Sequence, residues 1–149
     1  MSNVWKPNVV VAAICERDGK FLLVEEETGE GLRLNQPAGH WERDETLLQA
    51  VVREALEETA HVVEPTELLG AYTTHNLARD ITYLRFAYVC RVTGFDPGRA
   101  LDDGIVRAVW MTPEEIATSP IRHRSPLVSR CIQDYLSGRR FPLDFVTHS

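Results

Sequence analysis

This sequence has few cysteines, no long apolar run and no excess of positive charge, and each of these features excludes a class of protein. The three cysteines, Cys15, Cys90 and Cys131, are odd in number and far apart, so they form neither a zinc-binding spacing nor a disulfide framework. No apolar run approaches the roughly 18 residues of a membrane-spanning helix. Sixteen Lys and Arg against 22 Asp and Glu give a net charge of −6, which argues against binding nucleic acid through bulk charge.

The length and composition indicate one folded domain. The 149 residues are 44% apolar and 26% charged, which is typical of a chain that buries roughly 70% of its unfolded surface. Residues 1–7 lack the apolar core and small-residue cleavage site of a secretory signal. We therefore expect a single cytoplasmic domain over residues 1–149, with neither nucleic-acid nor membrane partners.

Short apolar runs and tight turns predict a strand-rich chain. Residues 9–15 and 21–24 are apolar, and Asp18-Gly19 between them favours the tight turn of a hairpin. Residues 28–31 predict a second turn, followed by a short strand at residues 32–34. Later strands are expected at residues 68–76, 81–93 and 105–111.

The clearest helix spans residues 46–59. Its first residue can cap the first turn, with Gln49 at the partner position of a capping box. Its apolar residues fall at helical spacing, and this stripe should face a sheet: Leu48, Val51, Val52, Ala55 and Thr59. Further helices should begin at Pro113 and Pro126, the second ending at Gly138. The order of elements indicates an α+β fold or a three-layer sandwich.

The opposite face of this helix carries Arg53, Glu54, Glu57 and Glu58. The three carboxylates share an arc of about 100°, and two charges about 6 Å apart at an effective dielectric near 20 repel by roughly 2.8 kcal/mol. One interpretation is a solvated surface, relieved by an Arg53–Glu57 pair. The other is a site that holds a hard divalent cation, for which clustered carboxylates are the usual ligands. Crowding at the helix C-terminus, where the helix dipole disfavours negative charge, favours the second interpretation.

The spacing around this face resembles the signature motif of the Nudix family. Gly39 is followed after five residues by Glu45, and after seven more by the segment 53–58, Arg-Glu-Ala-Leu-Glu-Glu. A match of six fixed residues is far more specific than a lone short motif. Two positions depart, because Ala60 stands where the family has glycine and His61 where it has an apolar residue. We therefore expect a different cap at the end of this helix.

The resemblance implies the Nudix fold, an α/β/α sandwich with a mixed sheet and a catalytic loop–helix between Gly39 and Ala60. It also implies Mg²⁺-assisted attack of water on a pyrophosphate chain, with Mn²⁺ as a substitute ion. The implied metal ligands are Glu54, Glu57 and Glu58, with Glu45 and the Gly39 carbonyl as additional ligands. Alternatively, Glu54 orients or deprotonates the attacking water. Arg53 would pair with one of the glutamates and hold it in place. Asp102 and Asp103 are either a further acidic group or a plain turn.

Segments outside the motif resemble a Nudix subgroup, the NudJ-like phosphatases. These segments are residues 35–40, 84–86 and 124–128, with Gly138 and Pro142 downstream. The subgroup acts on nucleoside di- and triphosphates and on thiamin-pathway pyrophosphates, which are therefore the expected substrates. The alternatives are nucleoside diphosphates linked to another group, such as ADP-ribose, and a module that binds nucleotide without cleaving it.

The rest of the substrate site is less well marked in the sequence. Candidates for contacting the substrate are Arg33, Asn35, Trp41 and Arg85, through cationic, amide or stacking contacts. Triphosphate-cleaving relatives often have a basic residue on the second strand, but this chain has three glutamates at residues 25–27. That departure argues against a nucleotide-sanitising role. We expect a monomer or a homodimer.

Overall fold

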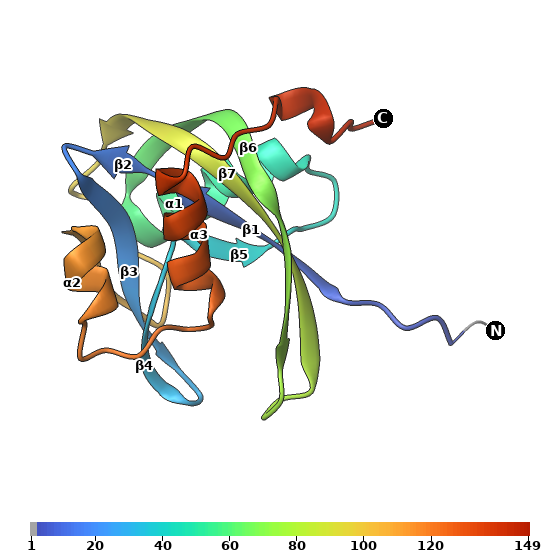
Figure 1. The fold of residues 1–149 in the computed structure, drawn as a ribbon, viewed down its shortest axis with the longest axis horizontal. Helices are drawn as coiled ribbons and strands as arrows, with labels where there is room; N and C mark the ends of the chain where they lie inside the picture. The colour runs from blue at the N-terminus through green and yellow to red at the C-terminus, as the bar shows by residue number, and fades with distance from the viewer. Residues whose placement is uncertain (1–2) are drawn as a thin grey trace.

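The computed structural model describes residues 3–149 as two four-stranded sheets with helices packed around them (Figure 1). Along the chain the elements are β1 (Asn8–Ile14), β2 (Glu16–Arg17), β3 (Lys20–Thr28), β4 (Gly31–Asn35), β5 (Ala38–His40), α1 (Leu47–Thr59), β6 (His61–Asn76), β7 (Ile81–Phe95), β8 (Ile105–Met111), α2 (Pro113–Ala117), α3 (Leu127–Leu136) and the 3₁₀ turn η1 (Leu143–Phe145). The first sheet has the order β5-β1-β7-β6, and the second joins β2, β3 and β4, with β8 paired to β3. No helix in the described part of the chain is long and apolar enough to cross a membrane.

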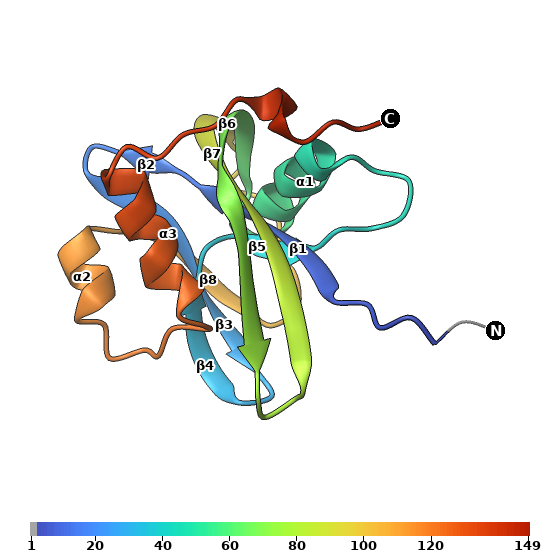
Figure 2. The same ribbon diagram turned by 45° about the vertical axis from the view of Figure 1, so that its right-hand side comes forward.

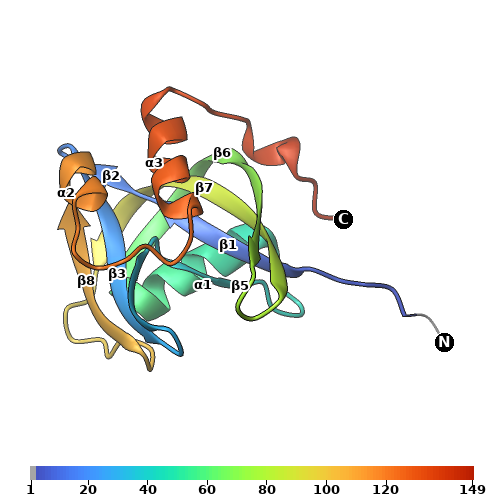
Figure 3. The same ribbon diagram turned by 60° about the horizontal axis from the view of Figure 1, so that its bottom comes forward.

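The first sheet is mixed, as expected. Strands β1 and β7 run parallel, whereas β5 is antiparallel to β1 and β6 is antiparallel to β7. Strand β1 reads as one apolar run because both of its faces are covered. Val11 and Ala13 belong to the core cluster under α1, and Ala12 and Ile14 belong to the cluster under α3. Figure 3 shows α1 and α3 on opposite sides of this strand, which is the expected sandwich.

The predicted N-terminal hairpin is wrong in its pairing but right in its turn. Asp18 and Gly19 both adopt positive φ, but the ladder around them joins only β2 to β3. Strand β1 instead pairs with β7, about seventy residues further along the chain, in the register Val11↔Phe86. Residues 9–15 are apolar on both faces, so their pattern does not specify which strand lies beside them.

Helix α1 has the predicted N-terminus and an unexpected C-terminus. The Thr46 side chain accepts a bond from the Gln49 backbone, and the Gln49 side chain accepts one from Thr46, which completes the capping box. At the other end Ala60 adopts the left-handed conformation, with φ 58° and ψ 14°. The expected change of cap is therefore wrong, because alanine takes the conformation usually left to glycine, at a cost of about 1–2 kcal/mol.

The later elements follow the predictions with different bounds. Strand β8 and the start of α2 match, and Gly138 has the positive φ of a helix stop. Strand β6 begins at His61, earlier than predicted, and β5 was missed inside a segment that reads only as turns. Strand β5 has three residues, too few for an alternating pattern to appear.

Candidate active site

A cavity of about 490 Å³ lies where the motif helix, two hairpins and the start of α3 meet. The β3–β4 and β6–β7 hairpins project on the same side of the molecule (Figures 1 and 2), and Asn76 Nδ2 donates to Glu30 Oε1 at 3.2 Å between their tips. One wall carries Glu54 and Glu58 of α1. The chain therefore brings two of its motif carboxylates to the wall of an accessible cavity.

Glu58 is a buried acid that has no cationic partner among residues 3–149. Its side chain accepts a hydrogen bond from the Ala38 backbone N–H at 2.9 Å, and the residue is 8% exposed. Burial raises its pKa to about 9, against the lowering effect of that hydrogen bond, and the nearby Glu54 and Glu26 carboxylates raise it further. Such a carboxylate gains strongly from a nearby cation.

Glu54 lies directly against the backbone of β5. A Cβ built on Gly39 would overlap the Glu54 carboxylate, so any larger residue at this position would displace the end of the Glu54 side chain. Burial raises the pKa of Glu54, while its ion pair with Arg53 acts in the opposite direction. The interpretation of this helix face as a solvated surface is therefore wrong for Glu54 and Glu58, whereas Glu57 remains partly exposed.

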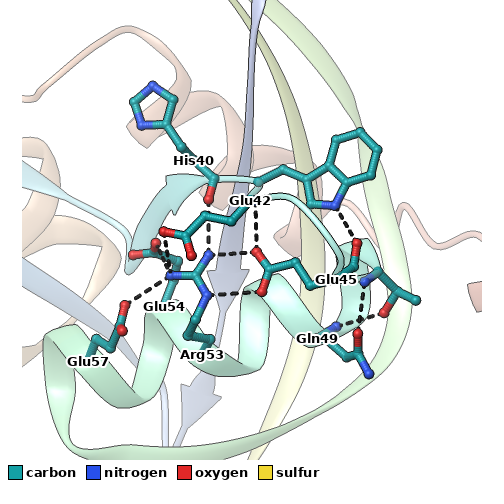
Figure 4. Close-up of polar contacts among 9 residues, drawn as sticks. His40, Glu42, Glu45, Gln49, Arg53, Glu54 and Glu57 are labelled. Carbon is teal, nitrogen blue, oxygen red and sulfur yellow. Dashed lines mark hydrogen bonds and ion pairs between the residues drawn. The ribbon is translucent and has the colours of Figure 1, made fainter.

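Arg53 is the centre of the ionic network (Figure 4). Its guanidinium donates to Glu54 Oε1 at 2.7 Å and Glu57 Oε1 at 3.0 Å, which includes the expected i, i+4 pair. It also holds Glu45 through two bonds, at 2.7 and 3.0 Å, and donates to the His40 carbonyl at 3.0 Å. Arg53 thus connects the loop before α1 to Glu54 and Glu57 of that helix.

Glu45 serves this network rather than the cavity. Its hydrogen bonds from Arg53 lower its pKa, and its Oε1 also accepts the backbone N–H of Glu42 at 2.9 Å. Trp41 donates its indole N–H to the Glu45 carbonyl at 2.7 Å. Glu45 is therefore placed to fix Arg53, and it does not line the cavity.

The loop after β7 brings Asp102 to the same helix. The Asp102 backbone N–H donates to the Glu57 carbonyl at 2.9 Å. Burial raises the pKa of Asp102, and the charges of Glu57 and Asp103 raise it further, against the lowering effect of Arg99. Asp102, rather than Asp103, is thus the acid of this loop that adjoins the motif.

The carboxylates are suitable ligands for a hard divalent cation, although they do not converge on one point as a complete set of metal ligands. In the part of the chain that the structure describes, no group of three or more acidic, histidine or cysteine side chains is arranged so that it could hold a metal ion. Arg53 draws Glu54 and Glu57 to itself, and Glu58 turns to Ala38. A divalent cation would relieve the raised pKa of Glu58 and Glu54 and would bind oxygen ligands of the kind it prefers.

The expected substrate residues divide into two pairs. Asn35 and Arg85 line the cavity beside each other, with Arg85 donating to Asn35 Oδ1 at 3.0 Å. Arg33 and Trp41 do not line it. Arg33 donates to the neighbouring Leu32 carbonyl, and Trp41 lies at a second hollow near the C-terminal segment.

Sequence reasoning missed a cation in the cavity wall. Arg124 donates to Glu26 Oε1 at 2.7 Å, and both residues line the cavity. The segment 25–27 contains no basic residue. The cation beside Glu26 is instead Arg124, which lies 98 residues further along the chain. A local pattern carries no signal for such a pair.

Comparison with known proteins shows the family to which this chain belongs. The model of the NUDIX domain family matches residues 5–130. Phosphatase NudJ of Escherichia coli strain K12 is 38% identical over 144 residues, covering 96% of this chain and 92% of that protein. The structure of a NUDIX hydrolase from Nitrosomonas europaea is 50% identical, covers 97% of this chain and 98% of its own, and has a TM-score of 0.93. A MutT NUDIX hydrolase from Burkholderia pseudomallei shares the fold at 21% identity, covers 87% of this chain and 98% of its own, and has a TM-score of 0.74.

The matched region contains the whole motif from Gly39 to Glu58 and most of the cavity wall. Both the family model and a relative above 30% identity extend over most of the chain. The chain therefore belongs to the Nudix family and is a Nudix hydrolase similar to the NudJ phosphatases.

Proposed function

We propose that this protein is a Mg²⁺-dependent hydrolase of pyrophosphate linkages in small phosphorylated metabolites. The proposed substrates are nucleoside tri- and diphosphates and thiamin-pathway pyrophosphates. The observation that carries the proposal is the pair of buried carboxylates, Glu54 and Glu58, on the wall of an accessible cavity. Buried acids with raised pKa values are costly to ionise, and they mark functional sites more often than surface acids do.

The proposed ligands of the metal are Glu54, Glu57 and Glu58, with the Gly39 carbonyl as a further oxygen. Mg²⁺ held by these residues would neutralise the charge on the phosphate oxygens, which the carboxylates would otherwise repel. Arg53 holds Glu54 and Glu57 in fixed orientations through the bonds described above. Glu45 in turn holds Arg53, so its role is positioning.

Alternatively, we propose that Glu54 accepts the proton of the attacking water instead of binding the metal. Of the three glutamates it combines exposure to the cavity with a raised pKa and an adjacent cation, Arg53. Burial raises the pKa of Glu54 and so makes its carboxylate a stronger base than an exposed glutamate. We propose that this machinery is contained in a single domain over residues 1–149.

The test is a screen of the purified protein with Mg²⁺ against phosphorylated metabolites, with orthophosphate and pyrophosphate measured separately. Glu57→Gln should lose most of the rate and keep its melting temperature within a few degrees, because Glu57 is partly exposed. Glu64→Gln is the matched control, since Glu64 pairs with Arg91 on an exposed surface.

Three outcomes would overturn the proposal. Equal turnover by Glu57→Gln and the wild type would show that this carboxylate is not needed. Full activity in EDTA would exclude the metal. Tight nucleotide binding without product after hours would indicate a binding module instead.

A further inference from the structure

Arg85 is a buried cation without a carboxylate partner among the described residues. It is 4% exposed and lies at the edge of the core under α3. Its guanidinium donates to Gln36 Oε1 at 2.9 Å, to Asn35 Oδ1 at 3.0 Å and to Cys131 Sγ at 3.8 Å. Its acceptors are therefore all neutral. A buried charge that is not paired is costly, so this site favours an electron-rich group of a ligand.

The same arginine decides which way two amides point. Arginine carries only donors, so Asn35 and Gln36 must turn their side-chain oxygens toward it. Gln36 is also fixed from the other side, because its Nε2 donates to the Val128 carbonyl at 2.9 Å. The amide of Asn35 has no such second partner among the described residues, and its Nδ2 group is left on the side away from Arg85.

Two donors are thereby left over beside the cavity. Asn35 and Arg85 both line it, and within the described chain neither Asn35 Nδ2 nor Arg85 Nε has a protein acceptor. Leu127, the first residue of α3, lines the same cavity, so the positive end of this helix dipole lies at the cavity as well. The lining of this cavity therefore includes both acids, Glu54 and Glu58, and hydrogen-bond donors, Asn35 and Arg85.

We propose that Asn35 and Arg85 form a donor-only patch that selects substrates whose organic half presents two neighbouring hydrogen-bond acceptors. The N3 and O2 atoms of cytosine are such a pair, whereas uracil has an N–H group at the first of these positions. Asn35 makes the contact, and Arg85 additionally acts as the positioning residue that fixes the polarity of the Asn35 amide. This inference rests on the proposed function, which assigns the phosphates to a metal ion held by the carboxylates of α1.

The experiment compares CTP and UTP, which have nearly the same size and identical phosphates. The wild type should favour CTP by about 10-fold or more in kcat/KM, through KM rather than kcat, because a good pair of polar contacts discriminates by factors of this order. Asn35→Asp replaces the donor with an acceptor and keeps a partner for Arg85, so it should reverse the preference toward UTP. Gln133→Glu, an amide-to-acid change on the exposed side of α3, is the control and should keep the wild-type preference.

Arg85→Met frees the Asn35 amide to rotate and should abolish the preference. Inorganic tripolyphosphate, which has no organic half, should be cleaved by Gln133→Glu at the wild-type rate, and the ratio of CTP turnover to tripolyphosphate turnover should fall in Asn35→Asp and Arg85→Met. If a variant fails to fold, the wild type still tests the inference with 3-deazacytidine triphosphate, which lacks the N3 acceptor and should bind as poorly as UTP.

Equal kcat/KM for CTP and UTP in the wild type would overturn the inference while leaving the proposed function intact. A parallel loss on tripolyphosphate in Asn35→Asp and Arg85→Met would overturn it too, by assigning the patch to phosphate. Absence of turnover for every phosphorylated compound with Mg²⁺ would instead refute the proposed function itself.

Discussion

Replacing Glu58 with glutamine should stabilise the metal-free protein while removing its response to Mg²⁺. Burial raises the pKa of Glu58 to about 9 from the ordinary 4.5. At pH 7.5 the unfolded chain ionises this group, whereas the folded chain keeps its proton. Three pH units at about 1.4 kcal/mol each give up to about 4 kcal/mol of lost stability at that pH. Glutamine resembles the protonated acid and can still accept the Ala38 N–H bond.

The sign of the pH dependence follows from the same numbers. Between pH 4.5 and 9 the folded state binds more protons at Glu58 than the unfolded state does, so stability falls as pH rises. Below pH 4.5 both states are protonated and this cost is absent. The variant lacks the group, so its free energy of unfolding should exceed that of the wild type by an amount that grows with pH.

Urea unfolding in EDTA at pH 5.5, 6.5, 7.5 and 8.5 measures this difference directly. Repeating the series with Mg²⁺ should stabilise the wild type by about 2.7 kcal/mol at 100 times the dissociation constant, and the variant by much less. Parallel pH curves for the two proteins would refute the burial argument. Equal stabilisation by Mg²⁺ would refute the role of Glu58 as a ligand.

Three further substitutions test particular contacts. Ala60→Gly should raise the free energy of unfolding by about 0.5 kcal/mol, because φ is 58° at this position. Ala60→Val should lower the free energy of unfolding by at least about 1 kcal/mol. Urea unfolding that ranks the two variants the other way would contradict the left-handed cap. Gly39→Ala should displace the Glu54 carboxylate and lower kcat by about 100-fold, and an unchanged kcat in steady-state assays would show that the overlap is relieved elsewhere. Arg53→Lys cannot hold Glu45, Glu54 and Glu57 together, so the Mg²⁺ concentration for half-maximal rate should rise by about 10- to 100-fold, and an unchanged Mg²⁺ titration would count against a positioning role.

Local patterns predicted the parts of the site that lie within one helix. The i, i+3 and i+4 spacing placed Arg53, Glu54 and Glu57 on one face, and the ion pairs of the structure join those residues. The capping box at Thr46 and the turn at Gly19 were predicted because each depends on only a few neighbouring residues. Even so, the burial of Glu54 could not be read from the helix, since it depends on β5 passing beside it.

Pairing between distant segments was beyond the sequence patterns. The apolar run of β1 is compatible with β3 or with β7 as a neighbour, and only the packed sandwich selects β7. The polarity of Asn35 likewise depends on Arg85, which comes from another strand fifty residues away.

The sequence by itself determined the family, the motif helix with its carboxylates and the residues that start and stop most elements, because these properties depend on short spacings along the chain. Tertiary structure alone decided which carboxylates are buried, which cation reaches Glu26 and which polar residues line the cavity. The physical reason is that burial and hydrogen-bond polarity depend on neighbours that folding brings together from distant positions, and a linear pattern carries no record of them.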